Sequence, residues 1–232
     1  MVRLSIMMYV IYFAVLMLLP LYAQRKVKKT YTRYSQEYST SGMTGAEVAR
    51  KILDQNGLGN VKVEPVDGFL SDHYDPSTKV VRLSTHNFYE TSIAGTAVAA
   101  HECGHAIQDA EAYSFLTWRS KLVPAANISS NASWIFIMIG MIATFKPLML
   151  VGIILLAIGV LFQVVTLPVE FDASKRAMRQ IDQLGIINNE EYPKAKKVLT
   201  AAALTYVAAA ATAVMELARL ILIYTGMGNR ED

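Results

Sequence analysis

The sequence feature that most constrains this chain is the run from Leu148 to Leu167, which contains no charged residue. Its length matches the hydrocarbon core of a bilayer, so it predicts a membrane-spanning helix. The whole chain is 53% hydrophobic and only 18% charged, and the apolar residues are concentrated in a few long runs. A chain of 232 residues would otherwise suggest one or two soluble domains, but this distribution predicts an integral membrane protein.

An apolar run near the amino terminus, Leu4 to Tyr22, is followed at once by basic residues: Arg25, Lys26, Lys28 and Lys29. A cleaved signal peptide ending at Ala23 is the alternative interpretation. However, Leu21 is bulky where a small residue is expected, and the positive charge follows the run instead of preceding it. We therefore interpret residues 1–22 as an uncleaved first transmembrane helix.

Residues 123–167 are predicted to form a transmembrane hairpin, because Lys146-Pro147 favours a tight turn between two apolar runs. The first half of this segment carries small polar residues, including Asn127 and Ser133, which we interpret as helix-packing groups and not as substrate contacts. Residues 168–197 follow as a charged helix and a basic connection. Residues 198–232 contain a long helix that is either a fourth span or enters the bilayer only at its end.

Residues 23–122, between the first span and the hairpin, are predicted to form a compact α+β unit. Thr44 and Glu47 have the spacing of a capping box, which predicts a helix that begins there and ends near Asn56-Gly57.

Two segments in this unit, 61–66 and 79–84, have the pattern of strands. A turn is predicted at 72–78, where Asp75-Pro76 occurs. We expect the two strands to pair as a β-hairpin. The expected fold class is α+β, mainly α, with three to four transmembrane helices and a small unit that carries the helix described next.

Residues 92–108 read SIAGTAVAAHECGHAIQ, and their good helix formers without a proline predict a buried helix. His101 and His105 lie four residues apart, so both imidazoles project from one face and can bind one ion. Neutral imidazoles suit zinc, and Glu102 is placed to take a proton from a water that zinc activates. This HExxH pattern predicts a zinc metallopeptidase; the alternative is its chance occurrence in a core helix.

A catalytic zinc takes three protein ligands, so a third partner must come from elsewhere in the chain. A short turn between two spans returns the chain to the side that it left, which places Glu170 on the same side as His101. Glu170 is therefore the preferred third ligand. The alternatives are Asp109 and Glu111, which are too close along the helix to swing round, and His73 and His86, which we interpret as surface or supporting groups.

Most of the 22 lysines and arginines lie in residues 23–125 and 168–197, whereas Arg3, Lys146 and Arg230 fall in the opposite loops. By the positive-inside rule, the zinc site is expected on the cytoplasmic face. The net charge of +3, without a basic block that contains aromatics, does not predict nucleic-acid binding. Cys103 is the only cysteine, which excludes an intramolecular disulfide, and we interpret it as a packing residue.

Three segments, KVVRLS, SIAGTAVAAHECGHAIQ and LPVEFDASKRA, resemble the YugP-type neutral zinc metallopeptidases, a prokaryotic membrane family. The resemblance extends from the first span to the final helix. It implies a gluzincin-like peptidase of the prokaryotic cell membrane, with His101, His105 and Glu170 as Zn²⁺ ligands and Glu102 as general base. The more distant CAAX prenyl protease family has a comparable EFxAD element, in which the final Asp is replaced here by Ser174.

We therefore predict a zincin-like, membrane-bound zinc metalloendopeptidase that hydrolyses membrane-associated proteins or peptides. Tyr206 and Arg219 are candidate oxyanion donors. The KVVRLS strand is expected to be an edge that pairs with an extended substrate. Asp172 is expected to orient another group or to cap its helix.

Two alternative functions follow from other readings of the same residues. One is a catalytically inactive, zinc-stabilised membrane adaptor with a closed four-ligand site. The other is a small transporter, but the spans before Glu216 lack the ionisable groups that such a pathway needs.

Overall fold

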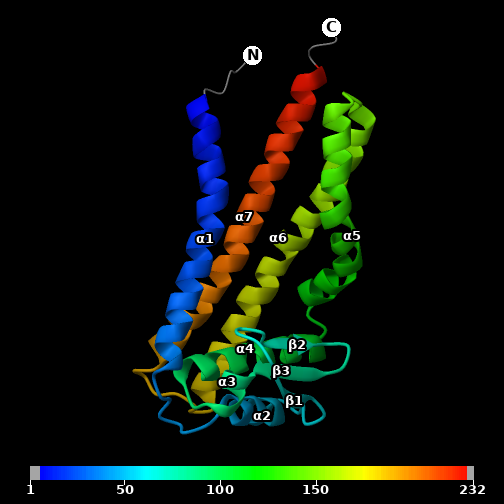
Figure 1. The fold of residues 1–232 in the computed structure, drawn as a ribbon. Coiled ribbons are helices and arrows are strands. Elements are labelled where there is room, and N and C mark those ends of the chain that lie inside the picture. Colours follow the sequence, from blue (N-terminus) through cyan, green and yellow to red (C-terminus); the bar gives the residue numbers. More distant parts are fainter. Residues whose placement is uncertain (1–5, 229–232) are drawn as a thin grey trace. The chain divides into compact units, whose positions relative to one another are not determined.

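The computed structural model describes residues 6–228, which form seven helices and a three-stranded sheet (Figure 1). Arg3 and Arg230, which entered the charge argument, lie outside the described residues. The helices are α1 (Ile6–Ser35), α2 (Gly45–Gln55), α3 (Thr85–Tyr89), α4 (Ile93–Ala110), α5 (Ser114–Ile142), α6 (Lys146–Gln183) and α7 (Tyr192–Gly228). The strands are β1 (Lys62–Val66), β2 (His73–Asp75) and β3 (Val80–Ser84).

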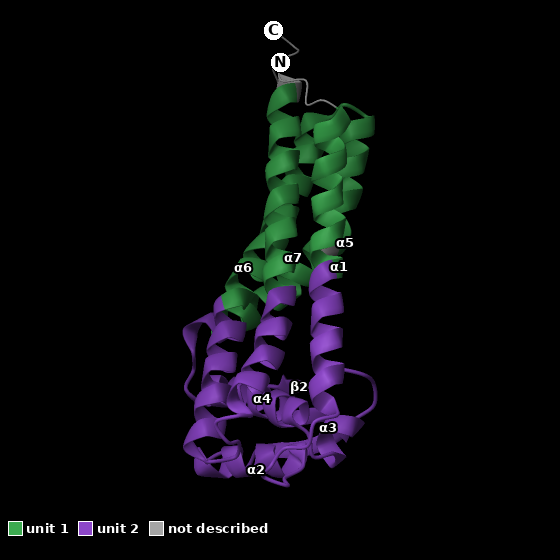
Figure 2. Cartoon of the chain, turned by 90° about the vertical axis from the view of Figure 1, so that its left-hand side faces the viewer, with its two compact units in different colours: residues 1–21, 117–167, 206–232 green, residues 22–116, 168–205 purple. Residues whose placement is uncertain are grey.

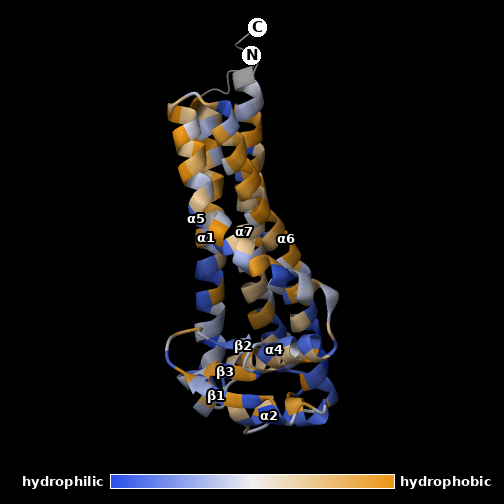
Figure 3. Cartoon of the chain, turned by 90° about the vertical axis from the view of Figure 1, so that its right-hand side faces the viewer, coloured by the Kyte–Doolittle hydropathy of each residue, from blue (hydrophilic) through white to orange (hydrophobic). Residues whose placement is uncertain are grey.

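The chain divides into two compact units (Figure 2). Unit 1 comprises residues 1–21, 117–167 and 206–232, and unit 2 comprises residues 22–116 and 168–205. Helices α1, α5, α6 and α7 each contribute residues to both units. The helical segments of unit 1 consist mainly of hydrophobic residues, whereas the segments of unit 2 contain both hydrophobic and hydrophilic residues (Figure 3).

Within the described residues, three helices are long and apolar enough to cross a membrane: α1, α6 and α7. Helix α5 makes a fourth candidate if its two segments, which are bent by 41°, are taken as one span. The structure therefore contains three to four helices suited to a bilayer. The last helix, whose extent the sequence left open, is among them.

Close helix packing in unit 1 depends on glycines of α5 and α6. A Cβ on Gly152 would lie 2.8 Å from the carbonyl oxygen of Ser133, and one on Gly140 would lie 2.5 Å from the backbone nitrogen of Met149. Small residues at such contacts let two backbones approach closely, which supports the packing interpretation of Ser133. The expected turn at Lys146-Pro147 is wrong by a few residues: the turn lies at 143–145, and Pro147 occupies the first turn of α6.

Other helices are longer than the sequence pattern suggested. Helix α1 continues through the basic segment to Ser35, although the predicted first span ended at residue 22. Helix α7 already begins at Tyr192, within the expected basic connection. Both extensions belong to unit 2, and each buries side chains in its core: Tyr31 and Tyr34 from α1, and Ala195 and Val198 from α7. These tertiary contacts stabilise helical turns that lie outside the apolar runs.

Helix α2 begins as its capping box predicts. The Thr44 side chain accepts a hydrogen bond from the backbone nitrogen of Glu47, and the Glu47 carboxylate accepts one from the backbone nitrogen of Thr44. Its apolar face packs on α4, with Ile52 and Leu53 fully buried. Helix α4 is therefore enclosed in the core of unit 2, as its composition predicts.

The sheet corrects the expected hairpin. β3 lies between the other two strands: β1 pairs with it in parallel, with Lys62 opposite Val80, and β2 pairs with it in antiparallel fashion, with His73 opposite Arg82. The hairpin is thus formed by β2 and β3, and part of the expected turn is a strand. The prediction that the KVVRLS strand is an edge is wrong, because both of its sides are paired along Val80–Arg82.

Candidate metal centre

The two histidines lie on α4, a helix whose start is defined locally. Ser92 caps it by accepting a hydrogen bond from the backbone nitrogen of Gly95 at 2.9 Å. One helical turn separates His101 from His105, and their ring centroids lie 4.7 Å apart. The spacing therefore places both rings on one face, as the sequence predicts.

Helix α6 approaches this face at Gly104. A Cβ on Gly104 would lie only 2.6 Å from the backbone oxygen of Ala173, closer than real Cβ contacts. The absence of a side chain at Gly104 thus permits the close approach of α6, which carries Glu170 one turn before Ala173. The structure thus gives Gly104 a specific part in bringing the two helices together.

Glu170 meets both imidazoles with a single carboxylate oxygen. Its Oε2 lies 3.2 Å from His101 Nε2 and 3.6 Å from His105 Nε2. Ligand atoms bound at the usual zinc distances in a tetrahedral site are about 3.4 Å apart. The three side chains therefore form a group that could hold a metal ion, with their ligand atoms within 4.8 Å of one another.

Gln108 determines which nitrogen of His105 carries a proton. Its Nε2 donates to the backbone oxygen of Val169 at 2.8 Å and to Asp172 Oδ2 at 2.9 Å. These two acceptors orient the amide so that Gln108 Oε1 faces His105 Nδ1, at 3.0 Å. Since Oε1 is only an acceptor, Nδ1 carries the proton and the neutral ring presents the lone pair of Nε2 to Glu170.

A lone pair and a carboxylate that face each other repel, and a cation between them removes the repulsion. The carboxylate of Glu170 is buried, with 2% of the residue exposed, so water offsets little of its charge. The donor set of two imidazole nitrogens and one carboxylate oxygen is one that zinc prefers. These residues therefore fit a zinc ion.

Supporting contacts surround the three side chains. Ser174 Oγ lies 3.2 Å from His101 Nδ1, so Ser174 itself contacts a candidate ligand at the position where the more distant family has Asp. Asp172 binds Gln108, in agreement with the expectation that it orients another group, and it also accepts a hydrogen bond from Arg176. Such contacts hold ligand rings in place and tune their basicity.

The sequence analysis missed Gln108. One signal could have found it: Gln108 lies three residues after His105 and therefore on the same face of the helix. A side chain at this spacing can reach Nδ1, the ring nitrogen that does not face Glu170.

Burial and neighbouring charges shift the pKa values of the titratable groups of the site in different directions. Burial raises the pKa of Glu170, but the hydrogen bond from His101 and the positive charge that either imidazole carries when protonated outweigh burial and hold that pKa well below its usual range. Burial raises the pKa of Glu102. Burial also lowers the pKa of His105, but the adjacent carboxylates of Glu170 and Glu102, which favour the protonated ring, outweigh burial, and the net shift is upward.

The rival ligands lie elsewhere. Asp109 accepts hydrogen bonds from Tyr74 and Lys79, and Glu111 pairs with Arg176 at 2.7 Å. His73 and His86 are exposed, as expected for surface groups. The candidate oxyanion donors Tyr206 and Arg219 belong to unit 1, and their role stays a prediction.

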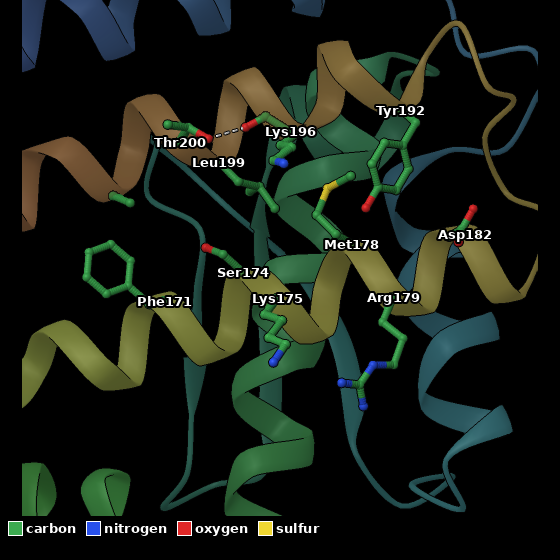
Figure 4. Close-up of a pocket in the computed structure, with 11 residues that line it drawn as sticks. Phe171, Ser174, Lys175, Met178, Arg179, Asp182, Tyr192, Lys196, Leu199 and Thr200 are labelled. Atoms are coloured by element: carbon green, nitrogen blue, oxygen red, sulfur yellow. Dashed lines mark hydrogen bonds between the residues drawn. The ribbon is translucent and has the colours of Figure 1, made fainter.

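A cavity of about 500 Å³ lies beside the metal centre in unit 2, between α6 and α7 (Figure 4). Ser174 contacts His101 and also lines this cavity. The other walls combine apolar residues, including Met178 and Leu199, with four charged residues: Lys175, Arg179, Asp182 and Lys196.

Comparison with known proteins agrees with the chemistry of this donor set. A family model described as "Putative neutral zinc metallopeptidase" matches residues 9–225. The chain belongs to this family. A relative called "Putative membrane protease YugP", from Bacillus subtilis (strain 168), is 48% identical over 206 residues, which cover 89% of this chain and 92% of the relative. No solved structure matches the chain.

Family membership implies Zn²⁺ as the cofactor, and His101, His105 and Glu170 could form its site. The family description and the name of the relative both indicate a protease, and the latter also indicates a membrane location. The long apolar helices of this chain fit such a location.

Proposed function

We propose that the chain is a membrane-bound zinc metalloendopeptidase of the gluzincin kind. His101, His105 and Glu170 bind the zinc ion, and Glu102 is the general base. One observation carries this proposal: Gln108 holds His105 so that its Nε2 lone pair faces the buried Glu170 carboxylate, an arrangement that a cation stabilises. The family match supports the same assignment.

When bound, zinc supplies Lewis acidity that polarises the scissile carbonyl and makes a water nucleophilic at neutral pH. Glu102 lies next to His101 on α4 and is 7% exposed. Its raised pKa suits a base that accepts a proton from the attacking water and then donates it to the leaving amine nitrogen. Gln108 and Ser174 meanwhile hold the two rings in place through their Nδ1 atoms.

The adaptor alternative requires a closed site with four protein ligands. Among residues 6–228, no fourth His, Cys, Asp or Glu joins the group of His101, His105 and Glu170. Three ligands leave a position for water, which is characteristic of a catalytic site. This supports hydrolysis over a purely structural role.

We further propose that unit 2 carries the chemistry while the apolar helices anchor the chain, so that membrane-associated proteins or peptides are the substrates. Glu170 follows the uncharged run of α6 by only three residues, which favours a site near the membrane surface. The KVVRLS strand (β3) is the central strand of the sheet and therefore has no free edge with which a substrate could pair. The cavity beside Ser174 can instead receive a substrate side chain.

Replacement of Glu102 tests the proposal. We expect the Glu102→Gln variant of the full chain, purified in detergent, to keep its zinc but to hydrolyse a fluorogenic casein-like substrate roughly 10² to 10⁴ times more slowly. The matched control is Glu90→Gln, the same change at an exposed residue just before α4, which should leave both quantities unchanged. Undiminished hydrolysis by the zinc-loaded Glu102→Gln variant would exclude Glu102 as the base.

We also propose that the zinc site faces the cytoplasm, because the basic residues cluster in the parts of the chain that carry the site. Since Cys103 is fully buried, a cysteine introduced at exposed Ser77 would be the main target of a membrane-impermeant thiol reagent. Labelling of Ser77→Cys in cells should require permeabilisation. Labelling of intact cells would place the site on the opposite face.

A further inference from the structure

A second cavity in unit 2, of about 630 Å³, lies between α1 and α7 and is unusually basic. We call it the basic pocket. It is lined by Lys26, Lys29, Thr30, Arg33 and Tyr34 of α1, and by Pro193, Lys196, Lys197, Thr200 and Ala201 of α7. Five of these residues are cationic and none is acidic.

Helix geometry explains why these residues meet. The five lining residues of α1 start at Lys26 and follow the spacing i, i+3, i+4, i+7 and i+8, and those of α7 follow the same spacing from Pro193. Each set therefore occupies one face of its helix. The pocket is thus formed by two regular helix faces, and both place lysines toward the same space.

The positive charge of the basic pocket is largely uncompensated. Arg33 has a carboxylate partner, because its Nε lies 3.7 Å from Glu37, but Glu37 also binds Lys194 at 2.7 Å. Within the described residues, no ion pair involves Lys26, Lys29, Lys196 or Lys197. Like charges around one cavity repel, and a bound anion relieves that repulsion.

The position of the cations along the chain indicates the kind of anion. On α1 they begin four residues after the apolar run that ends at Tyr22, and on α7 Lys196 and Lys197 directly precede the apolar segment from Val198. Basic residues at the ends of membrane helices lie at the level of lipid headgroups, and basic pockets between such helices bind phosphate-bearing lipids. The volume of the pocket is also within the range of small-molecule sites.

We propose that the basic pocket binds the phosphate headgroup of an anionic phospholipid. The inference rests on the membrane location proposed above but not on peptidase activity. The lysines of both helices bind the phosphate, while Tyr34, Pro193 and Ala201 supply the less polar part of the wall.

Two matched double variants on α1 test the proposal. Lys26→Gln/Lys29→Gln removes two cations from the pocket, and Arg25→Gln/Lys28→Gln removes two exposed cations of the same helix that do not line it. Each full chain is purified in detergent with equal amounts of phosphatidylglycerol and phosphatidylcholine. The lipid retained per protein is measured by mass spectrometry, and the thermal midpoint is measured with each lipid alone.

The wild type and Arg25→Gln/Lys28→Gln should retain phosphatidylglycerol selectively and be stabilised by it. Lys26→Gln/Lys29→Gln should bind it about thirtyfold more weakly and lose most of the stabilisation. Lys196→Gln/Lys197→Gln approaches the pocket from its other wall and should behave in the same way.

Equal losses in the two α1 variants would overturn the proposal, since they would indicate diffuse attraction to surface charge. Stabilisation of the wild type by phosphatidylcholine as strongly as by phosphatidylglycerol would also overturn it. If inorganic phosphate without lipid reproduces the full effect, the ligand is a soluble anion and not a lipid. Extraction of the chain from membranes by alkaline carbonate is a separate measurement that would refute the membrane location itself.

Discussion

Two clusters in this chain bring a glutamate into contact with at least one residue of another helix, and they satisfy its charge differently. In unit 1, Glu216 accepts hydrogen bonds from Arg219 Nε at 3.0 Å and from Tyr12 at 2.8 Å. In unit 2, Glu170 faces two imidazoles, one of which presents a lone pair. The first cluster contains its own cation, whereas the second, when its imidazoles are neutral, gains one only from a proton or a bound metal ion.

This difference separates a structural role from a functional one. A carboxylate paired with a guanidinium and a hydroxyl is satisfied within the protein, and it ties α1 to α7. A buried carboxylate that shares one oxygen between two rings supplies a site for an ion. The charges of the neighbouring groups thus distinguish the Glu216 cluster from the Glu170 cluster, whereas the burial of the two glutamates alone would not.

The same amide substitution in each cluster tests this contrast most directly. Glu170→Gln should lower zinc affinity by more than about a hundredfold, because a neutral amide is a poor zinc ligand. Loss of a residue that only orients a ligand already lowers metal affinity about 10–100-fold, and loss of a ligand itself should cost more. Glu216→Gln should leave zinc affinity unchanged. Zinc per protein, measured by mass spectrometry after dialysis against a graded chelator, decides the outcome. Full zinc occupancy in Glu170→Gln would remove this residue from the ligand set.

Loss of ring orientation should have the next largest effect. Gln108→Leu frees Nδ1 of His105, and Asp172→Asn weakens the hold on the Gln108 amide. We expect each to weaken zinc binding by about 10–100-fold without abolishing it. Asp109→Asn is the control, because that carboxylate binds Tyr74 and Lys79 instead. Equal zinc affinity in Gln108→Leu and the wild type would contradict the orienting role.

Acid should release zinc through His105. Its pKa is raised, so the ring accepts a proton at a higher pH than an ordinary histidine does. Zinc needs the neutral ring, so below that pKa the affinity should fall by about tenfold per pH unit. Glu170 has a lowered pKa and stays ionised over this range. Competition titrations of zinc against a chelator between neutral and mildly acidic pH measure the slope, and a flat profile would contradict this account.

The smallest effect is expected in the cluster of unit 1. Glu216→Gln removes the charge that Arg219 and Tyr12 bind, which should cost about 1–3 kcal/mol of stability. The thermal midpoint in detergent should fall by a few degrees while the zinc content stays that of the wild type. A coupled loss of zinc would show that the two clusters are not independent.

Local patterns predicted the elements well where the signal repeats along the chain. The capping box at Thr44, the helix of the two histidines and the apolar helices all depend on residues within a few turns of one another. Helix ends were less predictable. Helix α1 continues to Ser35 because Tyr31 and Tyr34 bury their rings in unit 2, which an apolar run cannot reveal.

Pairings between strands were harder to predict than the strands themselves. Residues 62–66 and 80–84 are strands as expected, but they run in parallel, and the antiparallel partner of β3 is a short strand inside the expected turn. Alternating side chains indicate which face is buried but carry little information about the neighbour.

The sequence by itself determined the spacing of His101 and His105, because four residues make about one turn of any α-helix. It also singled out Glu170, since a charged residue directly after an uncharged span is rare and has few places to lie. Only the tertiary structure decided that Gly104 permits α6 to approach, and that Gln108 orients the ring of His105. Those two facts depend on distances between segments that lie far apart in the chain, and no local repeat encodes such distances.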